Sequence, residues 1–467
     1  MDTIVAISTS PGIGGIGIIR MSGEKCFEIL KKIFEPKNKE SNIKGYTIKY
    51  GNIIDKEKKE IIDEVLVSYF KAPKSYTTED MCEINSHGGT IIMKQILELC
   101  VKNGAKMAEA GEFTKRAFLN GRIDLSQAEA VIDIINAKTE KEKRALINQL
   151  EGFLSREINV IKKEILSIMV DIEVNIDYPE YETVEVTNKN IINILQDSKN
   201  KLNKLKESFD DGKILRDGIK TAIIGKPNVG KSSLLNVILK EERAIVTEFE
   251  GTTRDTIEEY ITIQGVPFRI IDTAGIRVAE NEVEKIGIKK SMELAKEADL
   301  VIAIFDGSKK LDEQDYEILN MISGKTSIIV LNKVDLQDGG QEQEARKQIL
   351  EVEGRGENIE GQRKIVELSA LKKIGIEELY EAIKELYDVD KISVEGENIV
   401  TNVRHQGLIQ EAINNINKAI EDIKNNITID IIAIYIKNIL DSLSKITGEN
   451  ISEDIINEIF SKFCLGK

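Results

Sequence analysis

A glycine-rich stretch holds residue types that bind phosphate. It reads Gly225-Lys-Pro-Asn-Val-Gly-Lys-Ser232, after an apolar run at 221–224 and before a helix-like run at 233–240. Glycines let backbone N–H groups converge on phosphate oxygens, and a helix N-terminus adds partial positive charge. Lys231 has the length to reach the β- and γ-phosphates, and the Ser232 hydroxyl is placed to bind Mg²⁺. The alternative is a glycine-rich turn that binds nothing.

Further polar motifs follow apolar, strand-like runs. Asp272-Thr-Ala-Gly275 supplies a carboxylate for the Mg²⁺ shell and a glycine amide for the γ-phosphate, and Asn332-Lys-Val-Asp335 follows a second run. Asp335 can accept two hydrogen bonds from guanine N1–H and the exocyclic amine, which adenine does not offer, so the motif favours GTP over ATP. Ser369-Ala-Leu371 is a weaker element on the base side.

A pair of threonines completes the set. Thr252 and Thr253 fit a switch loop in which a threonine binds Mg²⁺ while the γ-phosphate is present. The elements occur in the order that a GTPase domain requires, and together they argue against the turn that binds nothing. The predicted GTP-binding residues are Asn228, Val229, Gly230, Lys231, Ser232, Ser233, Thr247, Thr252, Thr253, Asp272, Thr273, Ala274, Gly275, Asn332, Lys333, Asp335, Ser369 and Ala370.

Length and composition limit the class of protein. A chain of 467 residues is too long for one domain, and its 41% hydrophobic and 31% charged residues are ordinary for a globular protein. The net charge of −15 argues against broad coating of nucleic acid, although local basic patches remain open. The four scattered cysteines lack metal-ligand spacing, and no secretory signal or membrane-length apolar run is present, so we expect a cytoplasmic protein with free thiols.

We predict a multidomain chain of the α+β and α/β classes, whose helices and strands position these motifs. Segment 1–118 alternates strand-like runs and short helices, 119–213 is helical, 214–387 alternates strands and helices as in a parallel sheet, and 388–467 is helical again. We therefore predict a GTPase domain inserted into a helical domain, a division that close-lying termini permit.

Two predictions concern the helical segments. Apolar residues from Leu146 to Ile172 recur every three to four positions, which predicts one long core helix. A second helix, over about 191–209, is predicted to end near Gly212.

Two single residues remain ambiguous on spacing alone. His87 lies beside glycines and fits either a ligand site or an ordinary turn. Cys464 is four residues from the end of the chain, so it is either a reactive thiol or part of a frayed tail.

Motifs along the whole chain resemble the MnmE (TrmE) family of tRNA-modification GTPases. They are Gly12-Ile-Gly-Gly-Ile-Gly17 with Arg20, Ser86-His-Gly-Gly89, the stretches 111–120 and 124–130, the GTPase elements, and Cys464-Leu-Gly-Lys467. The resemblance implies an N-terminal folate-binding domain that forms a homodimer, a helical domain and an inserted Ras-like P-loop GTPase domain. It also implies a partner, the flavoprotein MnmG, which uses FAD and NADH and assembles with the protein as a heterotetramer.

The implied reaction adds an aminomethyl or carboxymethylaminomethyl group to C5 of the wobble uridine (U34) of certain tRNAs. A 5,10-methylene- or 5-formyl-tetrahydrofolate would donate the carbon at a site that uses Arg20, Glu83, Arg122 and Lys467. Arg122 stands where the family often has lysine, which keeps the charge but alters the geometry. The resemblance also favours a functional thiol at Cys464.

The resemblance assigns the GTPase chemistry as well. Ile276 stands where Ras-type enzymes place the glutamine that orients water, and the family gives this role to Glu284 through a bridging water. Asn228 matches a potassium ligand, completed by Thr247, Phe249 and Thr252, and Ser232 with Thr253 would hold Mg²⁺. K⁺ beside the phosphates supplies the positive charge that an arginine finger gives elsewhere.

Other classes of protein compete with this interpretation. A ribosome-assembly GTPase of the Era or Der type would need an appended RNA-binding module with a basic face, whereas the flanking regions here are acidic. A folate enzyme with a purely regulatory GTPase domain remains open.

Overall fold

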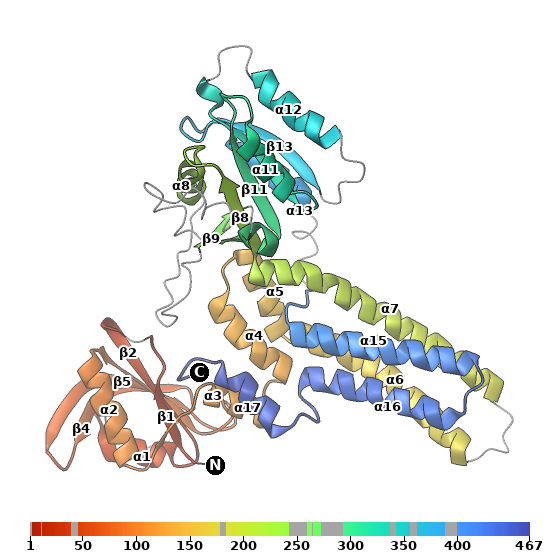
Figure 1. Ribbon diagram of the computed structural model, residues 1–467. Helices are drawn as coiled ribbons and strands as arrows, with labels where there is room; N and C mark the ends of the chain where they lie inside the picture. The colour runs from red at the N-terminus through yellow and green to blue at the C-terminus, as the bar shows by residue number, and fades with distance from the viewer. Residues whose placement is uncertain are drawn as a thin grey trace. The chain divides into compact units, whose positions relative to one another are not determined.

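The computed structural model describes residues 2–10, 12–38, 45–177, 184–241, 259–263, 265–271, 293–336, 342–354, 362–387 and 399–467. These residues form two compact units. The first contains residues 1–136, 146–201 and 407–467, and the second contains 137–145 and 202–406 (Figure 1). The four-part division predicted from the sequence has other boundaries, and it stays a prediction.

An N-terminal α+β fold opens the first unit. Its described strands form a sheet of order β3-β4-β5-β6-β2-β1-β7, and among them only β1 and β7 pair in parallel. The strands are β1 (Ile4–Ile7), β2 (Gly14–Ser22), β3 (Phe34–Pro36), β4 (Thr47–Asp55), β5 (Glu60–Phe70), β6 (Met81–Gly88) and β7 (Lys106–Met107), and the helices are α1 (Cys26–Ile33), α2 (Thr90–Lys102) and α3 (Glu112–Leu119).

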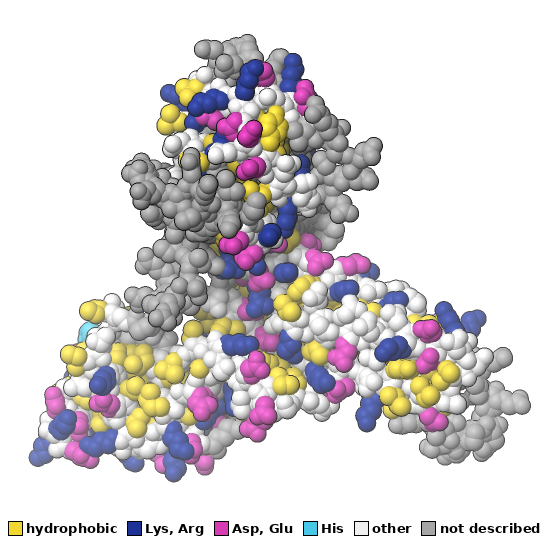
Figure 2. Space-filling view, viewed as in Figure 1, with side chains coloured by type: hydrophobic (Ala, Val, Ile, Leu, Met, Phe, Trp, Pro, Cys, Tyr) yellow, Lys and Arg dark blue, Asp and Glu magenta, His cyan; other side chains and the backbone are white. Residues whose placement is uncertain are grey.

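The two faces of this sheet differ, because side chains alternate along each strand. One face carries Ile19, Val67 and Ile84 into the core that includes residues of α1 and α2. The other face carries Arg20 opposite Glu83, with Leu66 and Tyr50 paired in the neighbouring row. Apolar side chains gather on the surface of this region in Figure 2, and Ile48, Tyr50 and Leu66 are among the exposed ones.

Long helices make up the rest of the first unit and extend into the second. They are α4 (Leu125–Asn136), α5 (Glu140–Leu150), α6 (Phe153–Asp177), α7 (Val184–Asp217), α15 (Val403–Lys424), α16 (Ile429–Thr447) and α17 (Glu453–Ser461). Helix α6 packs against α16, so segments before and after the GTPase motifs share one core. The predicted core face of α6 is confirmed, since Ile158, Ile165 and Ile172 are fully buried.

Both helix boundaries predicted from glycine and periodicity need correction. The run from Leu146 to Ile172 is not one helix, because Gly152 adopts a left-handed φ of 83° and separates α5 from α6. Conversely, α7 continues past Gly212 to Asp217. A Cβ on Gly212 would lie 2.2 Å from the carbonyl oxygen of Val400, so this glycine permits a close chain crossing and does not end the helix.

The described residues of the second unit form a mostly parallel six-stranded sheet of order β13-β12-β11-β8-β10-β9, and among these strands only the β9–β10 pair is antiparallel. The strands are β8 (Ile219–Gly225), β9 (Glu259–Ile263), β10 (Val266–Ile270), β11 (Leu300–Asp306), β12 (Ser327–Asn332) and β13 (Arg363–Leu368). The helices with described bounds are α8 (Lys231–Glu241), α11 (Glu313–Met321), the 3₁₀ turn η1 (Val334–Leu336), α12 (Glu342–Gly354) and α13 (Ile376–Tyr387).

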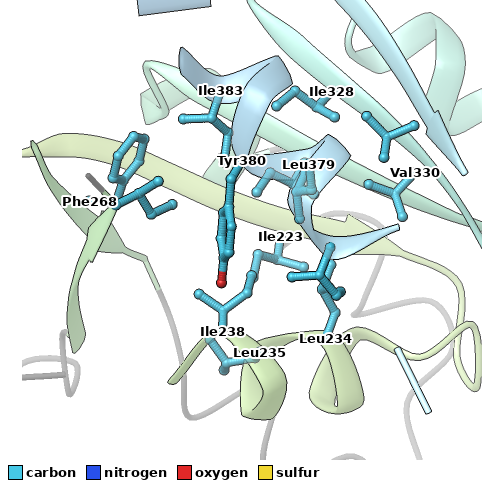
Figure 3. Packing of buried hydrophobic residues seen from close by; sticks show 14 of the residues in the cluster. Ile223, Leu234, Leu235, Ile238, Phe268, Ile328, Val330, Leu379, Tyr380 and Ile383 are labelled. Atoms are coloured by element: carbon cyan, nitrogen blue, oxygen red, sulfur yellow. The ribbon is translucent and has the colours of Figure 1, made fainter. Parts of the chain in front are cut away.

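Buried aliphatic side chains fix the helices to this sheet. Leu234 and Ile238 of α8, with Leu379 and Ile383 of α13, pack over strand residues such as Ile223 (Figure 3). Because α8 is held in this way, its first residues stay at the carboxyl end of β8, where the phosphate-binding motif lies. The predicted combination of an α+β fold, a helical region and an α/β fold is confirmed. Across the described ranges, no helix has the length and apolarity needed to cross a membrane.

Candidate functional site

The predicted phosphate loop lies between β8 and α8. Gly225 and Gly230 have φ values of 153° and 106°, and Asn228 has a left-handed φ of 63°. A Cβ on Gly230 would lie 2.1 Å from Nδ2 of Asn332, so a larger residue does not fit there. The loop therefore curls tightly at the N-terminus of α8, as an anion-binding turn requires.

The Lys231 ammonium is the main cation of this loop. Its Nζ donates to the carbonyl oxygens of Gly225 (2.8 Å) and Lys226 (2.7 Å), and burial lowers its pKa. Among the described residues it forms no ion pair with a carboxylate. A partly buried ammonium with only carbonyl partners is suited to an incoming phosphate, so the loop fits a nucleotide.

Asn332 connects the phosphate loop to the base-side loop. Its Nδ2 donates to the carbonyl oxygen of Val229 at 2.7 Å, and its Oδ1 accepts from the backbone N–H of Ala370 at 3.0 Å. The side chain is buried at the end of β12. Ser369 forms paired backbone hydrogen bonds with Ile374, which closes the base-side loop.

Lys333 and Asp335 follow at the same sheet edge. Lys333 has a left-handed φ of 69°, and its ammonium contacts Asp306 at 2.7 Å. Burial disfavours the charged form of Asp306, but the contacts with Lys333 and Ser308 outweigh it and hold the pKa of this carboxyl below its usual range. Asp335 is exposed in η1, so its carboxylate is open to an approaching base.

The structure thus brings together the described members of the predicted GTP site: Asn228 to Ser233, Asn332, Lys333, Asp335, Ser369 and Ala370. Ser232 and Ser233 lie in the first turn of α8 and are exposed. The remaining predicted residues lie outside the described residues: Thr247, Phe249, Thr252, Thr253, Asp272, Thr273, Ala274, Gly275 and Glu284.

A second group of predicted residues meets on the N-terminal sheet. Arg20 and Glu83 are direct cross-strand partners on β2 and β6. Two guanidinium nitrogens of Arg20 donate to one oxygen of Glu83, at 3.0 Å and 2.8 Å. The third donates to the carbonyl oxygen of Gly466 at 3.2 Å, which ties the end of the chain to this strand.

Arg20 and Glu83 line a cavity of about 610 Å³. Tyr76 lies at its wall, with the guanidinium of Arg122 at 4.8 Å and that of Arg20 at 5.6 Å from its ring centroid. The volume suits a small cofactor. Aromatic rings suit a flat heterocycle, and two guanidinium groups suit carboxylates, so the residues fit a folate.

The C-terminal tail is not frayed. The hydroxyl of Ser8 donates to the Gly466 carbonyl oxygen at 3.0 Å, and the backbone N–H of Phe113 donates to the carbonyl oxygen of Lys467 at 3.2 Å. The backbone of Lys467 is thereby held next to Gly466, which Arg20 binds, although Lys467 is not among the residues that line the cavity. The Cys464 side chain is exposed while its carbonyl oxygen accepts from Gly111, so the thiol is accessible on an anchored backbone.

Comparison with known proteins gives the family. Residues 125–464 match the model of the MnmE helical domain, and residues 3–122 match that of the GTP-binding protein TrmE N-terminus. The "tRNA modification GTPase MnmE" of Acetivibrio thermocellus is 51% identical over 466 residues, 100% of this chain and 99% of that protein. The protein of the same name from Thermoanaerobacter pseudethanolicus is 49% identical, with the same coverage of both chains. The chain belongs to the MnmE family.

Membership makes this chain a tRNA-modification GTPase, a GTP-hydrolysing enzyme for which GTP and Mg²⁺ are implied. Among solved structures, the G domain of the T. maritima FeoB transporter is 25% identical and covers 36% of this chain and 98% of its own, with a TM-score of 0.24. That score is too low to add to the assignment.

Some site residues of this MnmE-family chain are not predicted from the sequence. Asp306 ends β11 at the same sheet edge as Asn332 and binds Lys333, and the available signal is a polar residue at the end of a parallel strand. Tyr76 has no such signal, since it lies in an irregular segment. His87, ambiguous from its spacing, contacts buried Asp63 through Nδ1 at 2.7 Å.

Proposed function

We propose that this MnmE-family chain uses GTP hydrolysis and a reduced folate to modify C5 of U34 in tRNA, together with MnmG. The observation that carries the proposal is the cavity with Arg20, Glu83 and Arg122, beside which the tail holds Lys467. The folate, as a 5,10-methylene or 5-formyl derivative, supplies the carbon, while MnmG supplies FAD and NADH chemistry.

Each pocket side chain has a defined task in this proposal. Arg20 is held by Glu83, so its guanidinium faces the cavity in one orientation instead of sampling many rotamers. Arg122, held over Tyr76, adds a second positive charge for the carboxylates of the cofactor tail. Lys467 adds a third at the end of the anchored tail.

Cys464 is the proposed catalytic thiol. It is exposed, and its backbone is fixed near the folate residues by the same hydrogen bonds that hold Gly466.

At the GTP site, the tasks divide among the loop residues. Lys231 binds the β- and γ-phosphates, and Ser232 with Thr253 holds Mg²⁺. Asn228, Thr247, Phe249 and Thr252 hold K⁺, which supplies positive charge for the developing transition state. Glu284 orients water, since Ile276 cannot.

Two GTPase domains facing each other would complete the potassium site. The exposed apolar side chains of the N-terminal sheet, such as Tyr50 and Leu66, support a homodimer.

We propose that the protein acts in the cytoplasm, where it would meet tRNA and MnmG. Whole-length similarity to MnmE relatives favours this function over the Era- or Der-type alternative.

The direct test is reconstitution with purified MnmG, U34-containing tRNA, methylene-tetrahydrofolate, FAD, NADH, GTP and KCl. Nucleoside mass spectrometry should detect the C5-modified uridine, and omission of folate or GTP should abolish it. A product that forms equally well without folate would overturn the folate role.

A further inference from the structure

A second lysine of the phosphate loop, Lys226, is paired with two carboxylates. The ammonium of Lys226 contacts Oδ2 of Asp312 at 2.6 Å and Oδ2 of Asp315 at 2.7 Å, and its side chain is only 19% exposed. The contact with Lys226 lowers the pKa of the Asp312 carboxyl. Neither carboxylate belongs to the predicted GTP site, so this cluster needs its own explanation.

The two carboxylates are themselves rigidly placed at the N-terminus of α11. Asp312 is the N-cap, and its Oδ1 accepts from the backbone N–H groups of Gln314 and Asp315. The reciprocal hydrogen bond is also present, since Oδ2 of Asp315 accepts from the backbone N–H of Asp312 at 3.1 Å. This capping box fixes both acceptors before Lys226 binds them.

The opposite end of the same short segment is also fixed. Val229 is held through its carbonyl oxygen by Asn332, whose other side-chain atom is bound by Ala370. Pro227 and Asn228 are the only residues between Lys226 and Val229. Proline has a fixed φ, so little freedom is left between the two anchors.

Asn228 occupies this restrained position in the left-handed conformation, which is uncommon for residues other than glycine although asparagine adopts it more readily than most. Its φ is 63°, and its side chain is exposed. Such a conformation persists only when the surrounding structure holds it, and it is often found where a side chain must point in one direction. The anchors at Lys226 and Val229 supply that restraint.

We propose that Lys226, clamped by Asp312 and Asp315, is a positioning residue that aims the Asn228 amide oxygen at the bound monovalent cation. The inference rests on the proposed potassium site. It assigns to α11, through these two carboxylates, a part in cation binding without any contact with the cation. Lys226 also presents its carbonyl oxygen to Lys231, so the clamp and the phosphate lysine share one peptide.

The test uses the full-length protein with Mg²⁺, GDP and aluminium fluoride, and measures the melting temperature as KCl or NaCl is titrated. In the wild type, KCl should raise the melting temperature more than NaCl. In Lys226→Gln, the KCl concentration for half of this rise should increase about tenfold, the order expected from losing a charge-assisted hydrogen bond. Lys226→Arg can still bridge both carboxylates and should restore most of the response.

Two further variants separate positioning from stability. Asp312→Asn keeps a good N-cap but removes a charge, so it should shift the KCl midpoint in the same direction, and its effect should not add to that of Lys226→Gln. Lys364→Gln removes a surface ion pair with Glu385 in the same unit and should leave the midpoint unchanged.

The outcomes distinguish failure of the Lys226 inference from failure of the potassium proposal. If the wild type responds to KCl and Lys226→Gln responds at the same KCl concentration, the clamp is structural and the inference fails alone. The inference fails in the same way if Lys226→Gln lowers the melting temperature without nucleotide but leaves the KCl midpoint in place. If the wild type does not distinguish KCl from NaCl, the potassium proposal fails and this inference fails with it.

Discussion

The phosphate loop and the cavity proposed for folate each present a buried or half-buried cation, but they are built in opposite ways. Lys231 is held by carbonyl oxygens of Gly225 and Lys226, which lie within its own loop. Arg20 is held by Glu83, 63 positions away, and by Gly466, 446 positions away. One site is local in the chain, and the other requires the ends of the chain to meet.

The difference also concerns charge. Among the described residues, the Lys231 ammonium has no carboxylate partner, so a phosphate would provide its first full counter-charge. Arg20 is already paired with Glu83, so a folate carboxylate would join an existing network. Removing the first cation should therefore cost more than removing the second.

The largest effect is expected from Lys231→Ala. Loss of the ammonium removes positive charge next to the reacting phosphates, and GTP turnover should fall about 10³-fold or more. Single-turnover hydrolysis measures this directly, and melting without nucleotide checks folding. Near-normal turnover in a folded variant would show that Lys231 does not serve the reaction.

Glu284→Ala should follow in size. If this carboxylate orients water, turnover should drop about 10²-fold or more while the affinity for GTP changes little. Fluorescent-nucleotide titration and single-turnover rates on one preparation separate the two quantities. Unchanged turnover would remove Glu284 from the mechanism.

Arg20→Met tests the cavity on the N-terminal sheet, whose residues are far apart in the sequence. It leaves Glu83 without its cation and deletes a donor to the ligand, so the affinity for 5-formyl-tetrahydrofolate should fall about 10- to 100-fold by calorimetry. The affinity for GTP in the same protein should change much less. An equal loss at both sites would mean global damage and would erase the contrast between them.

The smallest effect is expected from Gly466→Ala. Gly466 has a φ of 83°, and a Cβ there would lie 2.3 Å from the carbonyl oxygen of Ile7, so the tail must shift. Folate affinity should drop several-fold, less than in Arg20→Met, because one hydrogen bond to Arg20 is disturbed. Gly407→Ala is the control, since nothing lies within 4 Å of a Cβ at that helical position, and it should bind folate normally.

The same contrast explains what the sequence could predict. The phosphate loop is contiguous, so its position between β8 and α8 followed from residue types alone, and the strand-end motifs followed from the parallel sheet. The partners of Lys226 lie 86 and 89 positions away at the start of α11, where no local pattern marks them. The folate residues came from family resemblance, because cross-strand register is not visible in a single sequence.

Two glycines show most clearly which helix boundaries a single sequence cannot predict. Gly212 looks like a helix end but is needed for close approach of Val400, while Gly152 lies inside an apolar periodicity and does break the helix. Tertiary contact decides the first case and local backbone conformation the second. Both positions are glycine, so the residue type alone does not distinguish the two cases.

The most direct experiment asks whether both sites serve one tRNA modification. Total tRNA from cells that lack this protein would be analysed by nucleoside mass spectrometry after rescue with the wild type, Lys231→Ala, Arg20→Met or Cys464→Ser, each checked for expression. We predict that only the wild type restores the C5-modified wobble uridine. Restoration by Arg20→Met or Lys231→Ala would contradict the shared role of the two sites, and restoration by Cys464→Ser would remove the thiol from the reaction.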